Sequence, residues 1–147
     1  MIWLLRHGDA SDSAPDDASR PLTEKGERQA RAAGAALAAL GERIDACLAS
    51  PKLRALQTAE LACEALGIEP EVADELRGGD FDPAALAAGR GNVLLVGHEP
   101  DFSRAIQGAT GGRVEMKKGG LAAIEGATLL TLIRPSHLRW IAAARND

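Results

Sequence analysis

The chain has few aromatic residues, few cysteines and no long apolar run. Of its 147 residues, 3% are aromatic: two are Trp, two are Phe and none is Tyr. A surface that stacks single-stranded nucleic acid needs exposed rings along a basic groove, so this composition argues against that class of protein. The core must instead rest on Leu, Ile, Val and closely packed small side chains, and alanine alone supplies about a fifth of the residues.

The cysteines and the apolar run at the start of the sequence bear on where in the cell the protein acts. Cys47 and Cys63 have no C-x-x-C spacing, which fits neither a disulfide framework nor a zinc site, so we expect both to be small buried residues. The apolar run at residues 2–5 ends at Arg6, far short of a signal-peptide core or of the roughly 20 residues of a membrane span. The sequence therefore predicts a cytoplasmic protein with no membrane partner.

No segment of the chain concentrates charge of one sign. Seventeen Lys and Arg face 21 Asp and Glu, for a net charge of −4, and no stretch collects five or more basic residues. Binding a polyanion such as nucleic acid through bulk charge is therefore disfavoured, and any anion must be bound locally. A length of 147 residues, 46% of them hydrophobic, predicts one domain over residues 1–147.

The order of apolar runs and cap signals predicts an α/β fold. Strands are expected at residues 2–5, 44–49, 71–73, 93–96, 121–124, 128–133 and 138–142. Helices are expected from a cap at Thr23 to about Leu40, from a cap at Ser50 with Pro51 in the first turn to Gly67, at residues 84–88, and around Phe102 and Ile106. This order indicates a three-layer αβα sandwich with a mixed, mainly parallel sheet and helices on both faces.

Three loops at the expected ligand edge of this sheet carry histidine and arginine. Ligands of such sheets bind beyond the carboxyl ends of the parallel strands, where the sequence places Arg6 and His7, then Arg54, then His98. Guanidinium forks match phosphate oxygens, and a neutral imidazole can attack phosphorus and carry the phosphoryl group. The residues predict phosphoryl transfer without a metal, because the two arginines would repel a cation held by His7, His98 and Asp9.

The same segments resemble the signatures of a known family. The chain has the opening R-H-G-D-A at residues 6–10, R-P-L-T-x-x-G at 20–26, S-P-x-x-R-A-x-Q-T at 50–58 and G-H-E-P at 97–100. Together they are similar to the histidine phosphatase superfamily, and within it to SixA-type phosphohistidine phosphatases. The resemblance implies a phosphoglycerate mutase-like fold, no cofactor, and hydrolysis of phosphohistidine on a partner protein, as in a phosphorelay of signal transduction, by a monomer.

The resemblance also implies roles for single residues. His7 would be the nucleophile, while Arg6, Arg54 and His98 would form the phosphate pocket. Arg20 would be either a third guanidinium of this pocket or an ordinary surface arginine. The general acid stays open among Glu99, Glu75, Asp80 and Asp9. Glu99 is the first choice, although a carboxylate is favoured at a helix start in any case.

Other functions remain alternatives at this point. They are a phosphatase for a small phosphomonoester and a weakly active, phosphate-dependent binding module. Residues 74–92 and 108–120 are too few for a substantial lid, which predicts a shallow, open site and favours a phosphoprotein substrate. Lys117 and Lys118 are either a turn face or guides for an acidic partner, and His137 is expected to be structural or exposed.

Overall fold

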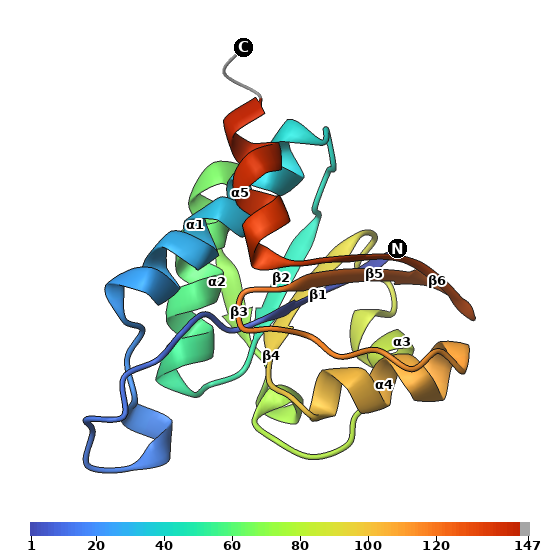
Figure 1. The fold of residues 1–147 in the computed structure, drawn as a ribbon. Coiled ribbons are helices and arrows are strands. Elements are labelled where there is room, and N and C mark those ends of the chain that lie inside the picture. Colours follow the sequence, from blue (N-terminus) through green and yellow to red (C-terminus); the bar gives the residue numbers. More distant parts are fainter. Residues whose placement is uncertain (145–147) are drawn as a thin grey trace.

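The computed structural model describes residues 1–144 and is built around a six-stranded sheet (Figure 1). The strands are β1 (Ile2–Arg6), β2 (Ala46–Ala49), β3 (Pro70–Val72), β4 (Val93–Gly97), β5 (Leu121–Glu125) and β6 (Thr128–Ile133). Their order is β3-β2-β4-β1-β5-β6. The first four strands are parallel, β5 runs antiparallel to β1, and β6 runs antiparallel to β5. The prediction of a mixed, mainly parallel sheet is confirmed.

Helices cover both faces of this sheet (Figure 1). One face carries α1 (Glu24–Ala39), α2 (Leu53–Leu66) and α5 (Pro135–Ala144), and the other carries α3 (Pro83–Ala87) and α4 (Asp101–Thr110). Two short 3₁₀ helices lie at Asp17–Ser19 and Asp74–Leu76. Each face buries its own apolar cluster, around Leu37 and Leu94 on the first and around Phe102 and Leu95 on the second. The predicted αβα layering is therefore confirmed.

The cap predicted at Thr23 starts α1 as expected. The Thr23 hydroxyl accepts a hydrogen bond from the backbone N–H of Gly26 at 3.1 Å, satisfying a donor that the first turn leaves free. Further along the helix, a Cβ at Gly34 would come within 2.1 Å of the Ala62 carbonyl of α2. Only glycine allows this approach, so small residues set the distance between α1 and α2.

The prediction of a last strand at residues 138–142 is wrong, because these residues form part of α5. Pro135 suits the first turn of a helix, where its missing N–H costs nothing. Leu138, Ile141 and Ala142 then lie at helical spacing and pack against the cluster that contains Leu37. A five-residue apolar run is too short to distinguish a buried strand from one face of a helix.

Ser50 does not cap α2, which corrects the helix start predicted there. The helix begins at Leu53, with Lys52 as a cap residue that makes no side-chain capping bond. The Ser50 hydroxyl accepts from the backbone N–H of Lys52 at 3.1 Å and lies 2.8 Å from His98. The Ser50 hydroxyl thus bonds the turn before the helix and His98, and the helix begins later than the motif suggests.

The two cysteines and the two tryptophans differ in how far they are buried. Cys47 and Cys63 are 1% and 2% exposed, which confirms the prediction that they are buried. Trp3 lies in β1 and is 4% exposed, whereas Trp140 lies on the outer side of α5 and is 74% exposed. Among residues 1–144, no helix is long and apolar enough to cross a membrane.

Candidate functional site

The ends of β1 and β4 bring His7 and His98 side by side. These strands are parallel neighbours with Arg6 opposite Gly97, so the next residue of each strand leaves the sheet at the same place. The two imidazole centroids are 5.3 Å apart, and the residues are 7% and 6% exposed. The sequence prediction that these loops meet at one edge is borne out by this geometry.

His7 is held in one tautomer by its own backbone. Its Nδ1 lies 2.7 Å from the Gly8 carbonyl oxygen, which can only accept, so Nδ1 carries the proton and Nε2 keeps a free lone pair. Burial is the main cause that lowers the pKa of His7 to about 4, with Arg54 and Arg6 acting in the same direction. The imidazole is therefore neutral near pH 7.

The loop after His7 is clamped between two helices. A Cβ at Gly8 would lie 2.6 Å from the Gly26 carbonyl of α1, so this position requires glycine. On the other side, the Gly8 N–H donates to the Thr58 hydroxyl of α2 at 3.1 Å, and that hydroxyl donates to the Arg54 carbonyl at 2.7 Å. The threonine of the S-P-x-x-R-A-x-Q-T segment thus positions the histidine loop, a role that sequence reasoning missed.

His98 is neutral as well, and only one of its two ring nitrogens has a hydrogen-bond partner among the described residues. Its Nε2 lies 2.8 Å from the Ser50 hydroxyl, whereas its buried Nδ1 has no partner among the described residues. Burial, followed by the charge effects of His7 and Arg54, lowers the pKa of His98 to about 3. Its ring therefore stands beside His7 with hydrogen-bonding capacity unused.

The two predicted arginines are anchored by carbonyl oxygens. Arg6 donates to the Met116 carbonyl at 2.8 Å, and Arg54 donates to the Asp17 carbonyl at 2.8 Å and to its carboxylate at 3.2 Å. Within residues 1–144, the Nε atoms of both arginines are buried without a partner. Each such buried donor costs about 1–3 kcal/mol, a cost that protein interiors seldom carry away from functional sites.

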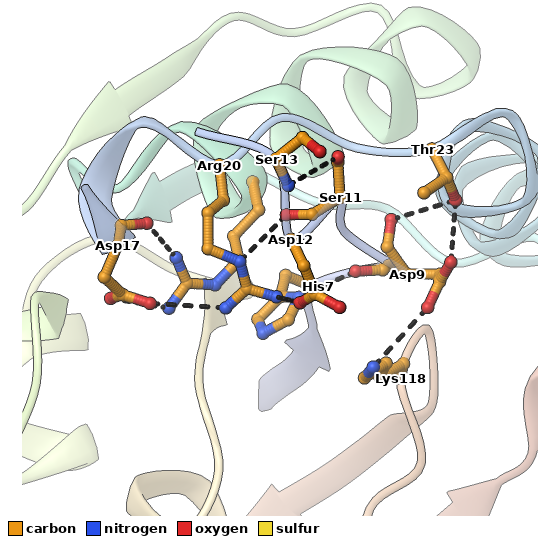
Figure 2. Close-up of polar contacts among 11 residues, drawn as sticks. His7, Asp9, Ser11, Asp12, Ser13, Asp17, Arg20, Thr23 and Lys118 are labelled. Carbon is orange, nitrogen blue, oxygen red and sulfur yellow. Dashed lines mark hydrogen bonds and ion pairs between the residues drawn. The ribbon is translucent and has the colours of Figure 1, made fainter. Parts of the chain in front are cut away.

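Arg20 joins the same site through Asp17 (Figure 2). The Asp17 carboxylate forms ion pairs with Arg20 at 3.2 Å, Lys52 at 3.3 Å and Arg54 at 3.2 Å. These contacts, the hydrogen bond from Arg54 above all, lower the pKa of Asp17 to about 2. Arg20 also donates through Nε to the Ser11 carbonyl at 2.9 Å. Its guanidinium is thereby held at the wall of the cavity.

These side chains surround a cavity of about 400 Å³ with no apolar side chain in its lining. The lining residues are Arg6, His7, Arg20, Lys52, Arg54, Arg77, Gly78, Gly79, His98, Glu99, Asp101 and Lys118. Six are cationic and two are acidic, so the site favours an anion. The predicted nucleophile His7, the predicted phosphate-binding residues Arg6, Arg20, Arg54 and His98, and the first-choice acid Glu99 all lie here. Lys52, Arg77 and Asp101 were missed, because none of them belongs to a motif whose role the residues alone reveal.

The four candidate acids are separated by the fold. Only Glu99 lines the His7 cavity, where it accepts from the backbone N–H and the hydroxyl of Ser103 in the first turn of α4. Glu75 and Asp80 line an adjacent cavity that contains neither histidine. Asp9 is bound by Thr23 at 2.8 Å and Lys118 at 3.4 Å (Figure 2).

The other sites considered from the sequence are not assembled. Residues 1–144 contain no group of three His, Cys, Asp or Glu side chains arranged to hold a metal ion. Asp9, the third member of the metal site considered above, is absent from the lining of the cavity that holds the two histidines. His137 is exposed on α5, where its ring lies 5.8 Å from that of Trp140.

The lowered histidine pKa values predict a pH-dependent stability. Between pH 6.5 and 4.5 an unfolded histidine takes up a proton that the folded His7 and His98 resist, so the free energy of unfolding must fall as the pH falls. We expect a loss of about 2 kcal/mol for each histidine, measured by urea unfolding at several pH values. Substituting Gln at His7 should reduce the slope, and substituting Gln at the exposed His137 should not. A flat profile for the parent chain would contradict the assignment.

Comparisons with known proteins agree with this geometry. A family model described as the histidine phosphatase superfamily (branch 1) matches residues 2–85. An uncharacterized protein of Picosynechococcus sp. (strain ATCC 27264 / PCC 7002 / PR-6) is 39% identical over 134 residues, which cover 82% of this chain and 81% of that one.

Solved structures extend the match to nearly the whole fold. A protein histidine phosphatase SixA complexed with tungstate is 27% identical with a TM-score of 0.82, covering 93% of this chain and 98% of that one. A Nakamurella multipartitia protein assigned as a SixA phosphohistidine phosphatase is 29% identical with a TM-score of 0.72, covering 91% and 95%. The expected phosphoglycerate mutase-like fold is thereby confirmed.

Proposed function

The chain belongs to the histidine phosphatase superfamily (branch 1) and is a phosphatase of the SixA type; we propose that it hydrolyses phosphohistidine on a partner protein through a covalent intermediate on His7. The observation that carries this proposal is the pair of buried, neutral histidines set among cations at one edge of the sheet. In His7 the Gly8 carbonyl holds the proton on Nδ1 and leaves the lone pair of Nε2 free, and the cations around it suit a phosphoryl group.

In the first step, Nε2 of His7 attacks phosphorus with its lone pair. The bond from phosphorus to the substrate's ring nitrogen breaks, its electron pair stays on the leaving imidazole, and that ring takes a proton from water or an acid. The Gly8 carbonyl keeps the His7 ring oriented and holds the proton on Nδ1. In the second step, the oxygen of water attacks phosphorus and the bond from phosphorus to Nε2 of His7 breaks. Its electron pair returns to Nε2, the attacking water gives up a proton to solvent, and inorganic phosphate leaves the neutral His7.

Arg6, Arg54 and His98 would stabilise the transferring group, with Arg20 as a further guanidinium. The phosphoryl oxygens carry the charge that develops during transfer, and fixed donors aimed at them lower the barrier most effectively in a buried site. The SixA neighbour binds tungstate, a tetrahedral oxyanion like phosphate, which supports oxyanion binding by this chain. These cations would supply the charge stabilisation that other phosphatases obtain from metal ions, so we propose a reaction without a cofactor.

A protein substrate is favoured because the cavity offers nothing to hold a small apolar body. None of its lining side chains is apolar, so binding must rest on the phosphoryl group and on surfaces around the rim. Arg77, Gly78 and Gly79 are exposed at that rim. We propose a cytoplasmic, monomeric phosphatase that acts in phosphorelay signalling.

A substrate panel tests this function. The chain is assayed on a histidine-phosphorylated protein and on small phosphomonoesters such as glycerol phosphate and sugar phosphates, with and without a chelator. We expect a kcat/KM at least about 10²-fold higher on the phosphohistidine protein, and no effect of the chelator. Preference for a small ester would favour the small-molecule phosphatase instead, and no turnover on any substrate would favour the binding module.

Glu99 gives a second, independent arm of the same test. A leaving imidazole on a labile P–N bond needs little help from an acid, whereas a leaving alkoxide needs a proton. Replacing Glu99 with Gln should therefore change kcat on phosphohistidine less than about 5-fold, and should slow any residual hydrolysis of an alkyl phosphate about 10²-fold. Asp80→Asn is the matched control, because Asp80 lines only neighbouring cavities. An equal loss on both substrates would contradict this account of the leaving group.

A further inference from the structure

Positive charge is concentrated in a second cavity next to the first. This cavity, of about 380 Å³, lies between the first turn of α1, the segment after Met116 and the start of α5. It is lined by Lys25, Arg28, Gln29, Lys117, Arg134, Pro135, Ser136 and Arg139. Five of these residues are cationic and none is acidic, in a chain whose net charge is −4.

Shared lining residues link the second cavity to the His7 cavity. A smaller cavity between them shares Arg6 and Lys118 with the first, and Lys25 and Lys117 with the second. We name the six exposed cations along this path the basic track: Lys25, Arg28, Lys117, Lys118, Arg134 and Arg139. The track leads away from the proposed phosphoryl site over the outer surface.

Most of these cations have no acidic partner. In the part of the chain that the structure describes, Lys25, Arg28, Arg134 and Arg139 form no ion pair. Lys117 lies 3.9 Å from Glu115, and Lys118 lies 3.4 Å from Asp9. Clustered like charges repel one another, and the start of α5 adds positive potential, so an anionic ligand would relieve this repulsion.

We propose that the basic track docks an acidic segment of the phosphoprotein substrate next to its phosphohistidine. This inference rests on the function proposed above and specifies the chemistry of the partner. The cations of the basic track are exposed, so they would guide and hold carboxylates while His7 receives the phosphoryl group. Complementary charge of this kind raises the rate of encounter and fixes the register of docking.

Other anions suit the track less well. It contains no aromatic ring on which a nucleotide base could stack. A long nucleic acid would also meet the net negative charge of the rest of the chain, whereas a short acidic segment is confined to the track. The observations therefore favour an acidic polypeptide.

Two synthetic peptides of equal length test this proposal. Each carries one phosphohistidine, flanked by glutamates in one peptide and by glutamines in the other. At low salt we expect the chain to hydrolyse the glutamate peptide with a kcat/KM about 10- to 100-fold higher, through KM, and salt near 0.5 M should reduce this preference to about 3-fold or less. Equal values for the two peptides at low salt would overturn the docking role and leave the proposed function intact.

Matched charge reversals assign the effect to the track. The variant R28E/R134E/R139E should lose the preference and keep its kcat/KM on the glutamine peptide within about 3-fold. The control R43E/R104E/R113E reverses three exposed arginines outside the track and should keep the preference. Loss of preference in both variants would mean that net charge, and not the track, is responsible, and this result would overturn the proposal.

Binding without turnover separates this proposal from the proposed function. Anisotropy of an unphosphorylated, labelled glutamate peptide should report a dissociation constant raised at least about 10-fold by the track variant and unchanged by the control. This holds whether or not any peptide is hydrolysed. An unchanged constant would overturn the proposal. Tighter, arginine-dependent binding of a DNA oligonucleotide would also overturn it, in favour of a polynucleotide site.

Discussion

Replacing His7 with alanine should abolish hydrolysis of phosphohistidine, with a loss of kcat of at least about 10⁴-fold, because no other side chain of the cavity is held as a neutral nucleophile in the same way. His98 lies 5.3 Å away, but its Nε2 is bonded to Ser50, and its Nδ1, which has no partner among residues 1–144, is buried. The measurement is turnover of a histidine-phosphorylated protein, together with acid-labile labelling of the chain by the transferred phosphoryl group. The parent chain should be labelled and His7→Ala should not.

Two controls keep this result from being a folding artefact. His137→Ala removes an exposed histidine of α5 that lies outside the cavity, so its turnover should match the parent chain. Tungstate should still raise the melting temperature of His7→Ala, because the arginines of the cavity remain and ligand binding stabilises the folded state. Turnover and labelling that survive in His7→Ala would place the nucleophile elsewhere.

Arg54→Ala should give the second-largest effect, a loss of about 10²- to 10³-fold in kcat/KM. Arg54 is buried beside both histidines, and its side chain is 8% exposed, so its charge acts in a medium where little water screens it. Arg54→Lys should recover only part of the loss, because an ammonium group cannot present two parallel donors to a phosphoryl group.

The same variants should weaken oxyanion binding. Inhibition by tungstate should require at least about 10-fold more ligand in Arg54→Ala, since a charge-assisted pair is removed from the cavity. Arg31→Ala is the matched control, because Arg31 makes only surface ion pairs with Glu27 and Glu64, which contribute little to stability. Unchanged tungstate inhibition in Arg54→Ala would exclude this arginine from the phosphate pocket.

Much of the fold and the centre of the site could be predicted, because they follow from local patterns and one rule of topology. The apolar run at residues 93–96 predicts a buried strand, and the structure has β4 there. Parallel strands place their carboxyl ends at one edge, so the loops after β1, β2 and β4 had to meet. This convergence brings His7, Arg54 and His98 together.

What the sequence did not reveal depends on contacts between distant segments. The apolar residues of α5 fit a strand as well as a helix in the sequence alone. Only their packing against the core cluster that contains Leu138 shows that they form one face of a helix. Arg77 lies at the rim of the cavity in a segment between β3 and β4 that no motif marks. The basic track combines residues 25–28, 117–118 and 134–139, so no single stretch of the sequence appears basic.

The two tryptophans give this chain separate optical reporters. Because it contains no tyrosine, its ultraviolet emission comes almost entirely from Trp3 and Trp140. Trp3 is buried in the central strand and emits from an apolar setting, so it responds when the sheet opens. Trp140 is 74% exposed and directly follows Arg139, so its emission responds to whatever covers that part of α5. Unfolding and docking can therefore be followed at different wavelengths in the unlabelled protein.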